Sequence, residues 1–449
     1  MKVVGLITEY NPFHNGHKYH IQEAKRLTGA DYVIAVMSGN FVQRGVPAVI
    51  DKYSRTGMAL QNGVDLVFEL PVCYATGSAE YFAHGAVSLL DKLGVVDMLC
   101  FGSECGEISP LSEAADYLLH APASYHGKLQ ALTKEGLTYP AARQKALQES
   151  LQASDAELSG EVSAILAEPN NILGIEYIKA LHSLSSSITP VTMKRISAHY
   201  HDIRLNTQAA SDSIDGETAL NHRTDLEGFD SVISSATAIR NAISHDNSSA
   251  KDGLSDAFRS VPEDVAEFLQ TNYQRTYPIT GEDFSAILKY KLLSEDASSL
   301  AAYQDITSDL ADRLKNLGDL NQSIDALALG IKTKNMTLTR INRALLHLLL
   351  NIKADSLKEY IRQDYILYAR LLGIRKESSA LLRCIEKEGR IPVITKVSKA
   401  ARQLSETGLQ MLSEDIFASH IYNQAVFNKY HTSMVNEYQH GICISLTKP

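Results

Sequence analysis

Two histidines, His14 and His17, stand on either side of a glycine in the segment HNGH at residues 14–17. The segment follows a short apolar run and begins a stretch with helical periodicity, which predicts a helix N-terminus here. Free backbone N–H groups and the positive end of the helix dipole attract phosphate to such a position. Gly16 lets the backbone approach a ligand closely, because it has no Cβ atom. The two imidazoles are therefore candidate catalytic groups that donate hydrogen bonds to phosphoryl oxygens as negative charge develops.

Two other interpretations of these histidines involve no phosphate. His14, His17 and the nearby His20 are also compatible with surface positions, and the spacing of the first two with part of a metal site. A zinc site needs further ligands at suitable spacing, and no acidic or cysteine partner supports one here. The place of the segment at the end of a predicted strand, with Pro12 before it and Gly16 inside it, favours phosphate binding. We therefore expect no dedicated metal site.

The elements that must position this segment alternate between strand and helix. Four apolar runs are predicted strands: residues 2–8, 31–37, 65–70 and 96–101. Helical patterns separate them at residues 15–27, 49–61 and 79–93. Nearly continuous apolar strands between helices are typical of a parallel sheet covered on both faces. We predict a doubly wound, Rossmann-like α/β fold, in which ligands bind beyond the carboxyl ends of the strands.

The second half of the chain has a different pattern. Residues 244–256 are polar and rich in Ser and Asp, as expected for a linker. Beyond them, stretches such as 312–320 and 338–352 carry helical periodicity and few strand signals. We predict a catalytic domain of residues 1–245, followed by a mainly α-helical domain of residues 246–449.

Composition restricts the class of protein. A hydrophobic share of 45% and a charged share of 21% over 449 residues are ordinary for a globular protein. No apolar run approaches the roughly 20 residues that span a bilayer. The five cysteines have neither disulfide-scaffold nor metal-ligand spacing, which is typical of reduced thiols and predicts a cytoplasmic protein. A net charge of −9 argues against a surface that is basic throughout, although it is compatible with a local basic groove.

The HNGH segment resembles the H-x-G-H signature of the nucleotidyltransferase superfamily, which includes class I aminoacyl-tRNA synthetases and small adenylyltransferases. That superfamily has a second phosphate-binding element, I-S-S-T-x-I-R, near the end of its catalytic domain. Residues 233–240, ISSATAIR, look similar to it, with one residue inserted before the threonine. On this resemblance Ser235 and Thr237 would cap a helix and bind phosphate, and Arg240 would hold pyrophosphate. Taken alone, the segment is more typical of a capped surface helix, and its pairing with HNGH is what favours the phosphate-binding interpretation.

A closer resemblance extends over nearly the whole chain. The stretches GLITEYNPFHNGH, SGNFVQRGVPA, FGSE and PNNILGIEY, with the helical second half, are similar to the bacterial tRNA(Met) cytidine acetate ligase family. The resemblance implies an enzyme that uses ATP to convert acetate to acetyl-adenylate. It also implies transfer of the acetyl group to N4 of the wobble cytidine of elongator tRNA(Met). Magnesium is expected with ATP, held by phosphate oxygens and water more than by protein ligands.

The same resemblance implies where ATP binds. Family contacts fall on the segment that matches residues 7–20 and on three separate positions further along the chain. With the second phosphate-binding element, the predicted ATP-binding residues are Ile7, Thr8, Glu9, Tyr10, Asn11, Pro12, Phe13, His14, Asn15, Gly16, His17, Lys18, His20, Gly102, Asn170, Arg195, Ser235, Thr237 and Arg240. Asn170 and its neighbour Asn171 are both compatible with the amide position.

Other polar residues near the predicted strand ends have no assigned role. Gln43 and Arg44 could face the substrate carboxylate or the end of the tRNA. Glu104 could hold water or magnesium. A solvated helix face is expected for three charged residues at the start of the second helix: Asp51, Lys52 and Arg55.

Basic residues gather at two places in the second half. Residues 331–350 contain no Asp or Glu. The basic residues of the first cluster are Lys332, Lys334, Arg340 and Arg343, and those of the second are Lys396, Lys399 and Arg402. A solvated charged face is the simpler interpretation. In an acidic chain that resembles a tRNA-modifying family, we prefer an RNA-binding groove.

Two other functions would use the same phosphate motifs. A small-molecule adenylyltransferase would turn over without RNA and would have no need for the helical second half. A non-catalytic tRNA-binding protein would show no ATP–pyrophosphate exchange, and the intactness of both motifs argues against it. The acyl group, the nucleobase and the oligomeric state do not follow from the residues alone.

Overall fold

The computed structural model of the chain describes residues 1–152, 165–166, 168–195, 232–244, 255, 257–318 and 320–445. Almost all of the predicted linker, residues 244–256, lies outside these ranges. The division into two domains at residue 245 therefore stays a prediction.

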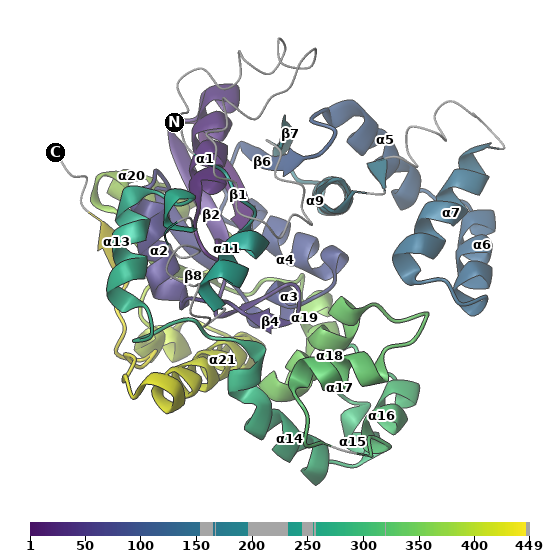
Figure 1. Cartoon of the computed structure of the whole chain (residues 1–449). Helices are drawn as coiled ribbons and strands as arrows, with labels where there is room; N and C mark the ends of the chain where they lie inside the picture. The colour runs from purple at the N-terminus through teal and green to yellow at the C-terminus, as the bar shows by residue number, and fades with distance from the viewer. Residues whose placement is uncertain are drawn as a thin grey trace.

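One large sheet of eight strands runs through the described part of the chain (Figure 1). Its order is β10-β8-β5-β2-β1-β6-β7, with β9 paired to β8, while β3 and β4 form a separate antiparallel hairpin. β5, β2, β1, β6 and β7 are parallel, which confirms the doubly wound prediction. The strands are β1 Val3–Thr8, β2 Tyr32–Ser38, β3 Phe41–Val42, β4 Val46–Pro47, β5 Leu66–Leu70, β6 Met98–Ser103, β7 Thr189–Lys194, β8 Ala369–Arg375, β9 Val393–Ile394 and β10 Cys443–Ser445.

Helices cover both faces of the sheet. On β2, Val33 and Ala35 belong to the core beneath α1 and α2, whereas Ile34 and Val36 belong to the core beneath α4 and α9. Both sets are apolar because both faces are buried, which explains the uninterrupted apolar run. Helices of the first half are α1 Asn15–Thr28, α2 Lys52–Gln61, α3 Val72–Ala75, α4 Ala79–Lys92, α5 Ile108–Leu119, α6 Ala123–Lys134, α7 Tyr139–Gln152, α9 Pro169–Ser183 and α11 Ala236–Ser244.

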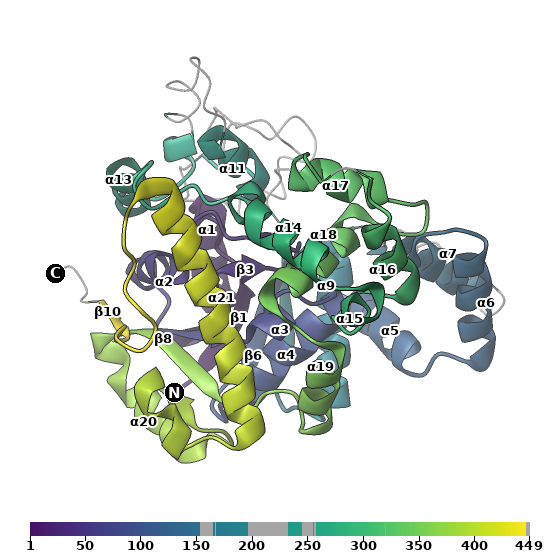
Figure 2. The ribbon, with the colours of Figure 1, turned by 90° about the horizontal axis from the view of Figure 1, so that it is seen from below.

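The second half is mainly helical, as predicted, and most of its helices form a group beside the sheet (Figures 1 and 2). The long helix α21 lies along this group. The helices are α13 Glu263–Asn272, α14 Ser285–Ser294, α15 Ala297–Leu300, α16 Ser308–Lys315, α17 Ile324–Ile331, α18 Leu338–Leu350, α19 Ala354–Arg362, α20 Ser379–Glu388 and α21 Glu406–Tyr430, with the 3-10 helices η3 Gly281–Phe284, η4 Lys376–Ser378 and η5 Val397–Arg402.

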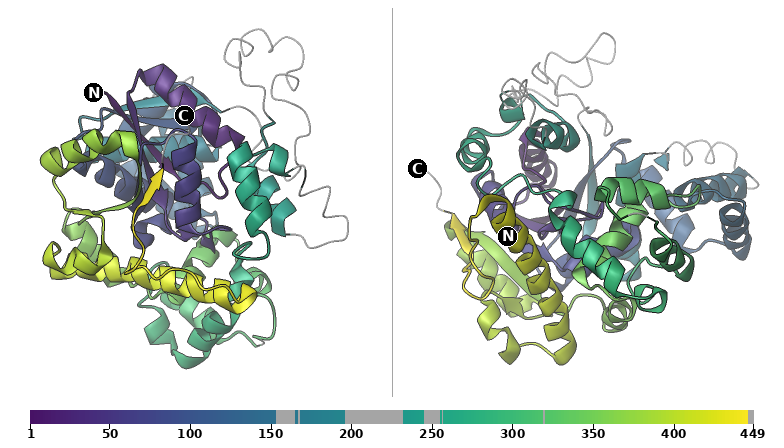
Figure 3. Two further views of the ribbon diagram at one scale, coloured as in Figure 1. Left: turned by 90° about the vertical axis from the view of Figure 1, so that its left-hand side faces the viewer. Right: turned by 60° about the horizontal axis from the view of Figure 1, so that its bottom comes forward.

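The second half also contributes strands to the sheet, which the helical prediction did not include. β8 pairs antiparallel with β5, and Glu69 lies opposite Arg370 in the register. β10 pairs with β8 and packs beside α2 (Figure 3). The segment that forms β8, ARLLGIR, is almost wholly buried but has only four uncharged residues, LLGI, between two arginines. Periodicity alone does not separate so short an apolar stretch from a buried helix.

The charged residues at the start of α2 are buried, so the predicted solvated face is wrong. Lys52 and Arg55 have no exposed surface, and Asp51 caps the helix through the backbone N–H groups of Tyr53 and Ser54. The physical reason is tertiary, because β10 and α21 of the second half cover this end of α2.

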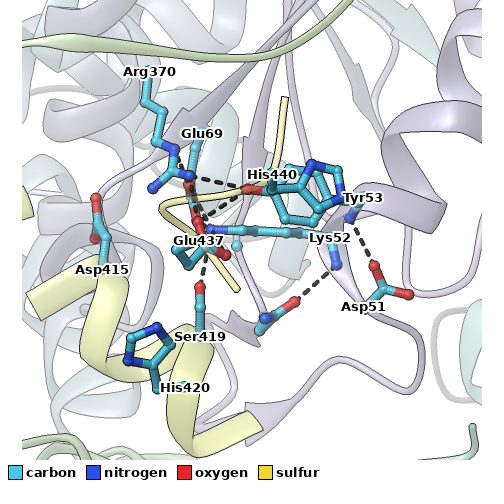
Figure 4. Close-up of polar contacts among 12 residues, drawn as sticks. Asp51, Lys52, Tyr53, Glu69, Arg370, Asp415, Ser419, His420, Glu437 and His440 are labelled. Carbon is cyan, nitrogen blue, oxygen red and sulfur yellow. Dashed lines mark hydrogen bonds and ion pairs between the residues drawn. The ribbon is translucent and has the colours of Figure 1, made fainter. Parts of the chain in front are cut away.

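A buried charge cluster of Lys52, Glu69, Arg370, Ser419 and Glu437 joins the two halves (Figure 4). Lys52 Nζ donates to Glu69 Oε1 at 2.7 Å and to Ser419 Oγ at 2.9 Å, and lies 3.2 Å from Glu437 Oε1. Arg370 binds Glu437 and approaches Glu69 Oε2 at 3.4 Å. Burial opposes ionisation of Glu437, but Lys52 and Arg370 outweigh it and lower its pKa to about 2. The cluster is thus made of paired ions in the core.

Candidate functional site

A pocket of about 290 Å³ lies at the carboxyl ends of β1 and β6. The chain passes from β1 outward to β2 and β5 and then returns to β6 on the other side of β1. In a doubly wound sheet this reversal leaves a crevice above the strand ends, and ligands bind in it. The first strand and the HNGH segment therefore lie where the fold itself provides a binding site.

The two histidines of the HNGH segment cap helix α1 through one nitrogen each. His14 Nδ1 accepts a hydrogen bond from the backbone N–H of Gly16 at 3.1 Å. His17 Nδ1 accepts one from the backbone N–H of His14 at 3.2 Å. The two rings are stacked with their centroids 3.7 Å apart. Because Nδ1 accepts in both rings, the proton of each neutral imidazole lies on Nε2, and each ring presents an N–H donor.

Both histidines stay neutral in this environment. Burial, with the positive charges of Arg195 and Arg240, lowers the pKa of His14 to about 3. The same effects, together with the adjacent histidines, hold the pKa of His17 well below its ordinary value. The positive charge of the pocket therefore comes from arginines, while the histidines act as uncharged donors.

Five of the predicted ATP-binding residues do not line the pocket, and three of them support the segment from behind. Tyr10 and Phe13 are buried behind the loop, with ring centroids 4.8 Å apart, and the Tyr10 ring meets His17 edge-on. Asn15 Nδ2 donates to the carbonyls of Val232 and Arg259, at 2.9 and 3.1 Å. The five are Tyr10, Pro12, Phe13, Asn15 and Lys18.

The second phosphate-binding element meets the first across the pocket. Ser235 Oγ accepts from the backbone N–H of Ala238 at 3.0 Å and so caps α11, as expected. Arg240 donates to the carbonyl of Asn11 at 2.7 Å and to Thr237 Oγ1 at 3.0 Å. Its guanidinium is thereby fixed between two segments that are 229 residues apart in the chain.

Gly102, Asn170 and Arg195 come together on the β6–β7 side of the pocket. A Cβ atom on Gly102 would lie 3.1 Å from Cγ of Arg195, so a larger residue would press on the arginine. Asn170 Oδ1 accepts from Arg195 at 3.4 Å, and its Nδ2 donates to Glu104 Oε1 at 2.5 Å. The predicted trio is thus one connected group.

Asn170 and Asn171 have different structural roles. Asn170 lines the pocket, whereas Asn171 is buried and accepts hydrogen bonds from the backbone N–H groups of Glu104 and Cys105. Glu104 in turn accepts from the Asn171 backbone N–H at 2.9 Å. Glu104 therefore orients the N-terminus of α9, and the geometry favours Asn170 as the residue that faces a ligand.

The β3–β4 hairpin closes the pocket on the β2 side. Glu9 Oε1 accepts from the backbone N–H of Gln43 at 2.9 Å and ties the hairpin to the end of β1. Arg44 is mostly buried, which lowers its pKa, while the charge of Glu9 opposes that shift. Gln43 and Arg44, which the sequence left without a role, both line the pocket.

Comparison with known proteins shows the family. The HIGH nucleotidyl transferase family model matches residues 1–215 and 212–437. The tRNA(Met) cytidine acetate ligase of Thermoanaerobacter sp. (strain X514) is 40% identical over 429 residues, which cover 95% of this chain and 96% of the relative. The protein of the same name from Acetivibrio thermocellus is 36% identical, covering 99% of this chain and 100% of the relative. The chain belongs to the tRNA(Met) cytidine acetate ligase family.

Two solved structures have the same fold over the whole chain. Thermotoga maritima TmcAL bound with alpha-thio ATP matches with a TM-score of 0.83 and 29% identity, covering 100% of both chains. The apo form of that protein matches with a TM-score of 0.85, 30% identity and the same coverage. The neighbour's ATP analogue supports ATP use by the family fold.

Several apolar pocket residues were not predicted as site residues from the sequence. The apolar walls of the pocket include Val42, Val46, Phe82, Leu173 and Met193. Residues of these types are common in any hydrophobic core, so their types alone do not indicate a pocket. Val42 and Val46 lie in the stretch SGNFVQRGVPA and Leu173 in PNNILGIEY, whereas Phe82 and Met193 lie outside the stretches that carry the resemblance.

Neither a metal cage nor a membrane span is found in the part of the chain that the structure describes. There, no group of three or more His, Cys, Asp and Glu side chains could hold a metal ion. Glu9 is the one carboxylate among the described residues that line the pocket. These residues do not fit a protein-held magnesium ion, and magnesium bound with ATP stays a prediction. No described helix is long and apolar enough to cross a membrane.

Proposed function

We propose that this chain is an ATP-dependent ligase that activates acetate and acetylates N4 of the wobble cytidine of elongator tRNA(Met). Family membership supports the ligase activity and the substrates that the relatives' name carries. The observation that carries the mechanism is that two neutral histidine donors and the fixed Arg240 guanidinium meet in one pocket. This pocket lies where the strand order of the sheet reverses. A cytoplasmic location belongs to the same proposal.

In the first step an acetate oxygen attacks the α-phosphorus of ATP. A new O–P bond forms, the bond from the α-phosphorus to the oxygen bridging to the β-phosphorus breaks, and pyrophosphate leaves with both electrons. The Nε2–H groups of His14 and His17 stabilise the charge on the α-phosphoryl oxygens, and Arg240 holds the leaving pyrophosphate. No covalent enzyme intermediate is needed, because carboxylate is already a nucleophile at neutral pH.

The nucleoside of ATP is assigned to the β6–β7 side of the pocket. Gly102 leaves room for a sugar or base against the backbone, and the Asn170 amide offers both a donor and an acceptor. Arg195 lies beside it in the same pocket and would contact the phosphates. With Ser235 and Thr237 at the N-terminus of α11, these residues would hold the nucleotide along its length.

In the second step the cytidine N4 attacks the acetyl carbon of the adenylate. A C–N bond forms, the C–O bond to AMP breaks, and N4 loses a proton. We assign the helical second half, residues 246–449, to holding the tRNA. Lys332 and Lys334 are exposed and Arg340 is half-buried beside them, whereas Arg343 is paired with Asp305 at 3.1 Å. The first three are therefore the better candidates for phosphate contacts.

The deciding experiment incubates the purified chain with tRNA, ATP, magnesium and isotope-labelled acetate, followed by mass spectrometry of the tRNA nucleosides. We expect labelled N4-acetylcytidine in elongator tRNA(Met), and none when ATP is left out. Acetate-dependent exchange of ATP and pyrophosphate without any labelled nucleoside would point instead to an enzyme that acts on a small molecule. Absence of both reactions would leave a non-catalytic tRNA-binding protein.

A further inference from the structure

The proposed nucleotide site uses only one side of the pocket. His14 follows β1 at the start of α1, while Gly102 on β6 and Arg195 after β7 lie on the side of β1 away from β2. The other side, next to β2, is lined by the β3–β4 hairpin and by Phe82 from the first turn of α4. Because both sides belong to one continuous pocket, a second reactant on the β2 side would lie beside the phosphates.

The β2 side of the pocket has an apolar wall. Val42 and Val46 are direct cross-strand partners in the hairpin, so their side chains lie on the same face, and both line the pocket. Phe82 adds a buried aromatic ring. Gly45, at a φ of 76°, packs the turn against α18, and a Cβ atom there would lie 2.3 Å from the backbone nitrogen of Arg343. The wall is therefore held from behind and cannot easily move outward.

The charges beside this wall suit a small anion. Arg44 and Arg240 both interact electrostatically with Glu9, and with each other. Arg44, Arg195 and Arg240 outnumber Glu9, the one carboxylate among the described residues that line the pocket. With Arg195 and Arg240 assigned to the phosphates, Arg44 is the cation next to this wall that can attract a substrate carboxylate. An apolar wall next to a net positive charge is complementary to a short aliphatic acid.

We propose that the β2 side of the pocket is the acid subsite, in which Val42, Val46 and Phe82 contact the alkyl group and Arg44 attracts the carboxylate. The inference rests on the proposed function and adds the residues that limit the size of the acid. A longer acid would have to displace the wall, and one methylene in an apolar pocket changes specificity by about 10- to 200-fold.

The test measures acid-dependent ATP–pyrophosphate exchange with acetate, propionate and butyrate. Val46→Ala should raise the ratio of kcat/KM for propionate to that for acetate by about 10-fold, with the KM for ATP within about 2-fold of the parent. Leu173→Ala removes the same kind of side chain from the α9 wall, and serves as the matched control. It should raise the KM for ATP and leave the ratio between acids unchanged.

Two further variants keep the inference testable if Val46→Ala fails to fold. Val46→Ile narrows the subsite, so propionate use should fall relative to acetate. Arg44→Gln should raise the KM for acetate about 10-fold or more while the KM for ATP stays near that of the parent. An unchanged ratio between acids in the Val46 variants, or a shift produced by Leu173→Ala instead, would overturn the subsite. Absence of exchange in the parent with any acid would instead refute the proposed function.

Discussion

At the scale of single residues, the hydrogen bonds of the HNGH segment determine what its histidines can do. Each ring uses Nδ1 to cap α1 and keeps Nε2–H for a ligand. One side chain thus stabilises a helix end and keeps an N–H donor, which we propose binds phosphate. The two roles predict different results for different substitutions.

Substitutions of His17 can remove its Nε2–H donor while keeping an acceptor that caps α1. An asparagine can keep an acceptor near the position of Nδ1, so His17→Asn should retain most of the stability and lose the Nε2–H donor. We expect acetate-dependent ATP–pyrophosphate exchange to fall by about 100-fold or more, with a much smaller change in ATP affinity. His17→Gln, whose amide nitrogen can lie near the position of Nε2, should recover part of the rate. Near-parental exchange in the asparagine variant would remove His17 from the mechanism.

The protonation of His14 can be observed directly. Burial and the nearby arginines lower its pKa to about 3, so the ring should stay neutral, with its proton on Nε2, from pH 8 to pH 5. Nitrogen-15 NMR of the imidazole in the ligand-free protein would show this. Because the folded pKa is below the ordinary value near 6.5, the associated stability is present above that value and is lost as the pH falls. A titration midpoint near 6.5 would contradict the prediction.

At the scale of elements, α21 is a long helix that carries buried acids. Glu414 Oε1 accepts from the hydroxyl of Tyr360 at 2.8 Å, and the neighbouring Asp415 accepts from the backbone N–H of Val72 at 2.7 Å. Burial raises the pKa of Glu414 to about 8, the Tyr360 hydrogen bond opposes the shift, and Asp415 adds to it. The helix is thus docked against α3 and α19 with a carboxyl group that is protonated at neutral pH.

This docking predicts that stability depends on pH above neutrality. A carboxyl group whose folded pKa is raised contributes stability that is complete below its ordinary value near 4.5 and is lost as the pH rises through about 8. The melting temperature of the parent should therefore fall from pH 6 to pH 9. Glu414→Gln, which is uncharged throughout, should lose less thermal stability over the same pH range, because its side chain has no proton to release. Parallel decline of parent and variant would show that Glu414 ionises freely.

At the scale of the whole molecule, the two halves share one sheet and one ion cluster. β8 extends the sheet beyond β5, and Lys52 contacts Glu437 and Ser419 of the second half. The same helix start carries Arg55, whose guanidinium binds the carbonyls of Glu9, Ser38 and Gly39 at the strand ends. The second half therefore supports the edge of the sheet at which the pocket lies.

Removing Lys52 should destabilise the entire chain. Lys52→Met leaves two buried carboxylates without one of their two cations, and breaking a buried ion pair in this way costs about 3–5 kcal/mol. Urea unfolding would measure the change in free energy. Lys387→Met, at an exposed lysine on α20, is the matched control and should change the free energy by less than about 0.5 kcal/mol. Equal effects of the two substitutions would show that the cluster contributes nothing to stability.

The proposed roles of the two halves, adenylation in the first and tRNA binding in the second, can be tested separately. Charge reversal at Lys332, Lys334 and Arg340 should leave ATP–pyrophosphate exchange nearly intact, because these residues are not on the pocket. Acetyl transfer should fall steeply, and the salt dependence of tRNA binding should decrease by about one unit of slope per lost phosphate contact. Arg343 is left unchanged, since its reversal would also break the ion pair with Asp305. If the triple variant binds and acetylates tRNA as the parent does, the tRNA lies on another surface.

The sequence by itself determined the elements whose information is local. The strands of the first half could be predicted because both faces are buried and each run is apolar from end to end. The HNGH segment and Arg240 could be singled out because phosphate chemistry needs particular residue types near helix N-termini. Each of these signals lies within a short stretch of the chain, so it can be recognised without knowing which distant residues pack against it.

Only the tertiary structure decided the features that depend on distant partners. Lys52 and Arg55 look like surface residues until β10 and α21 cover them, since a charge is buried or exposed according to what packs on it. The choice between Asn170 and Asn171 depends on the turn that orients the start of α9. The walls made by Val46 and its neighbours join elements that are far apart in the chain. Apolar residues that line a pocket cannot be distinguished in the sequence from those that fill the core, because the same residue types occur in both.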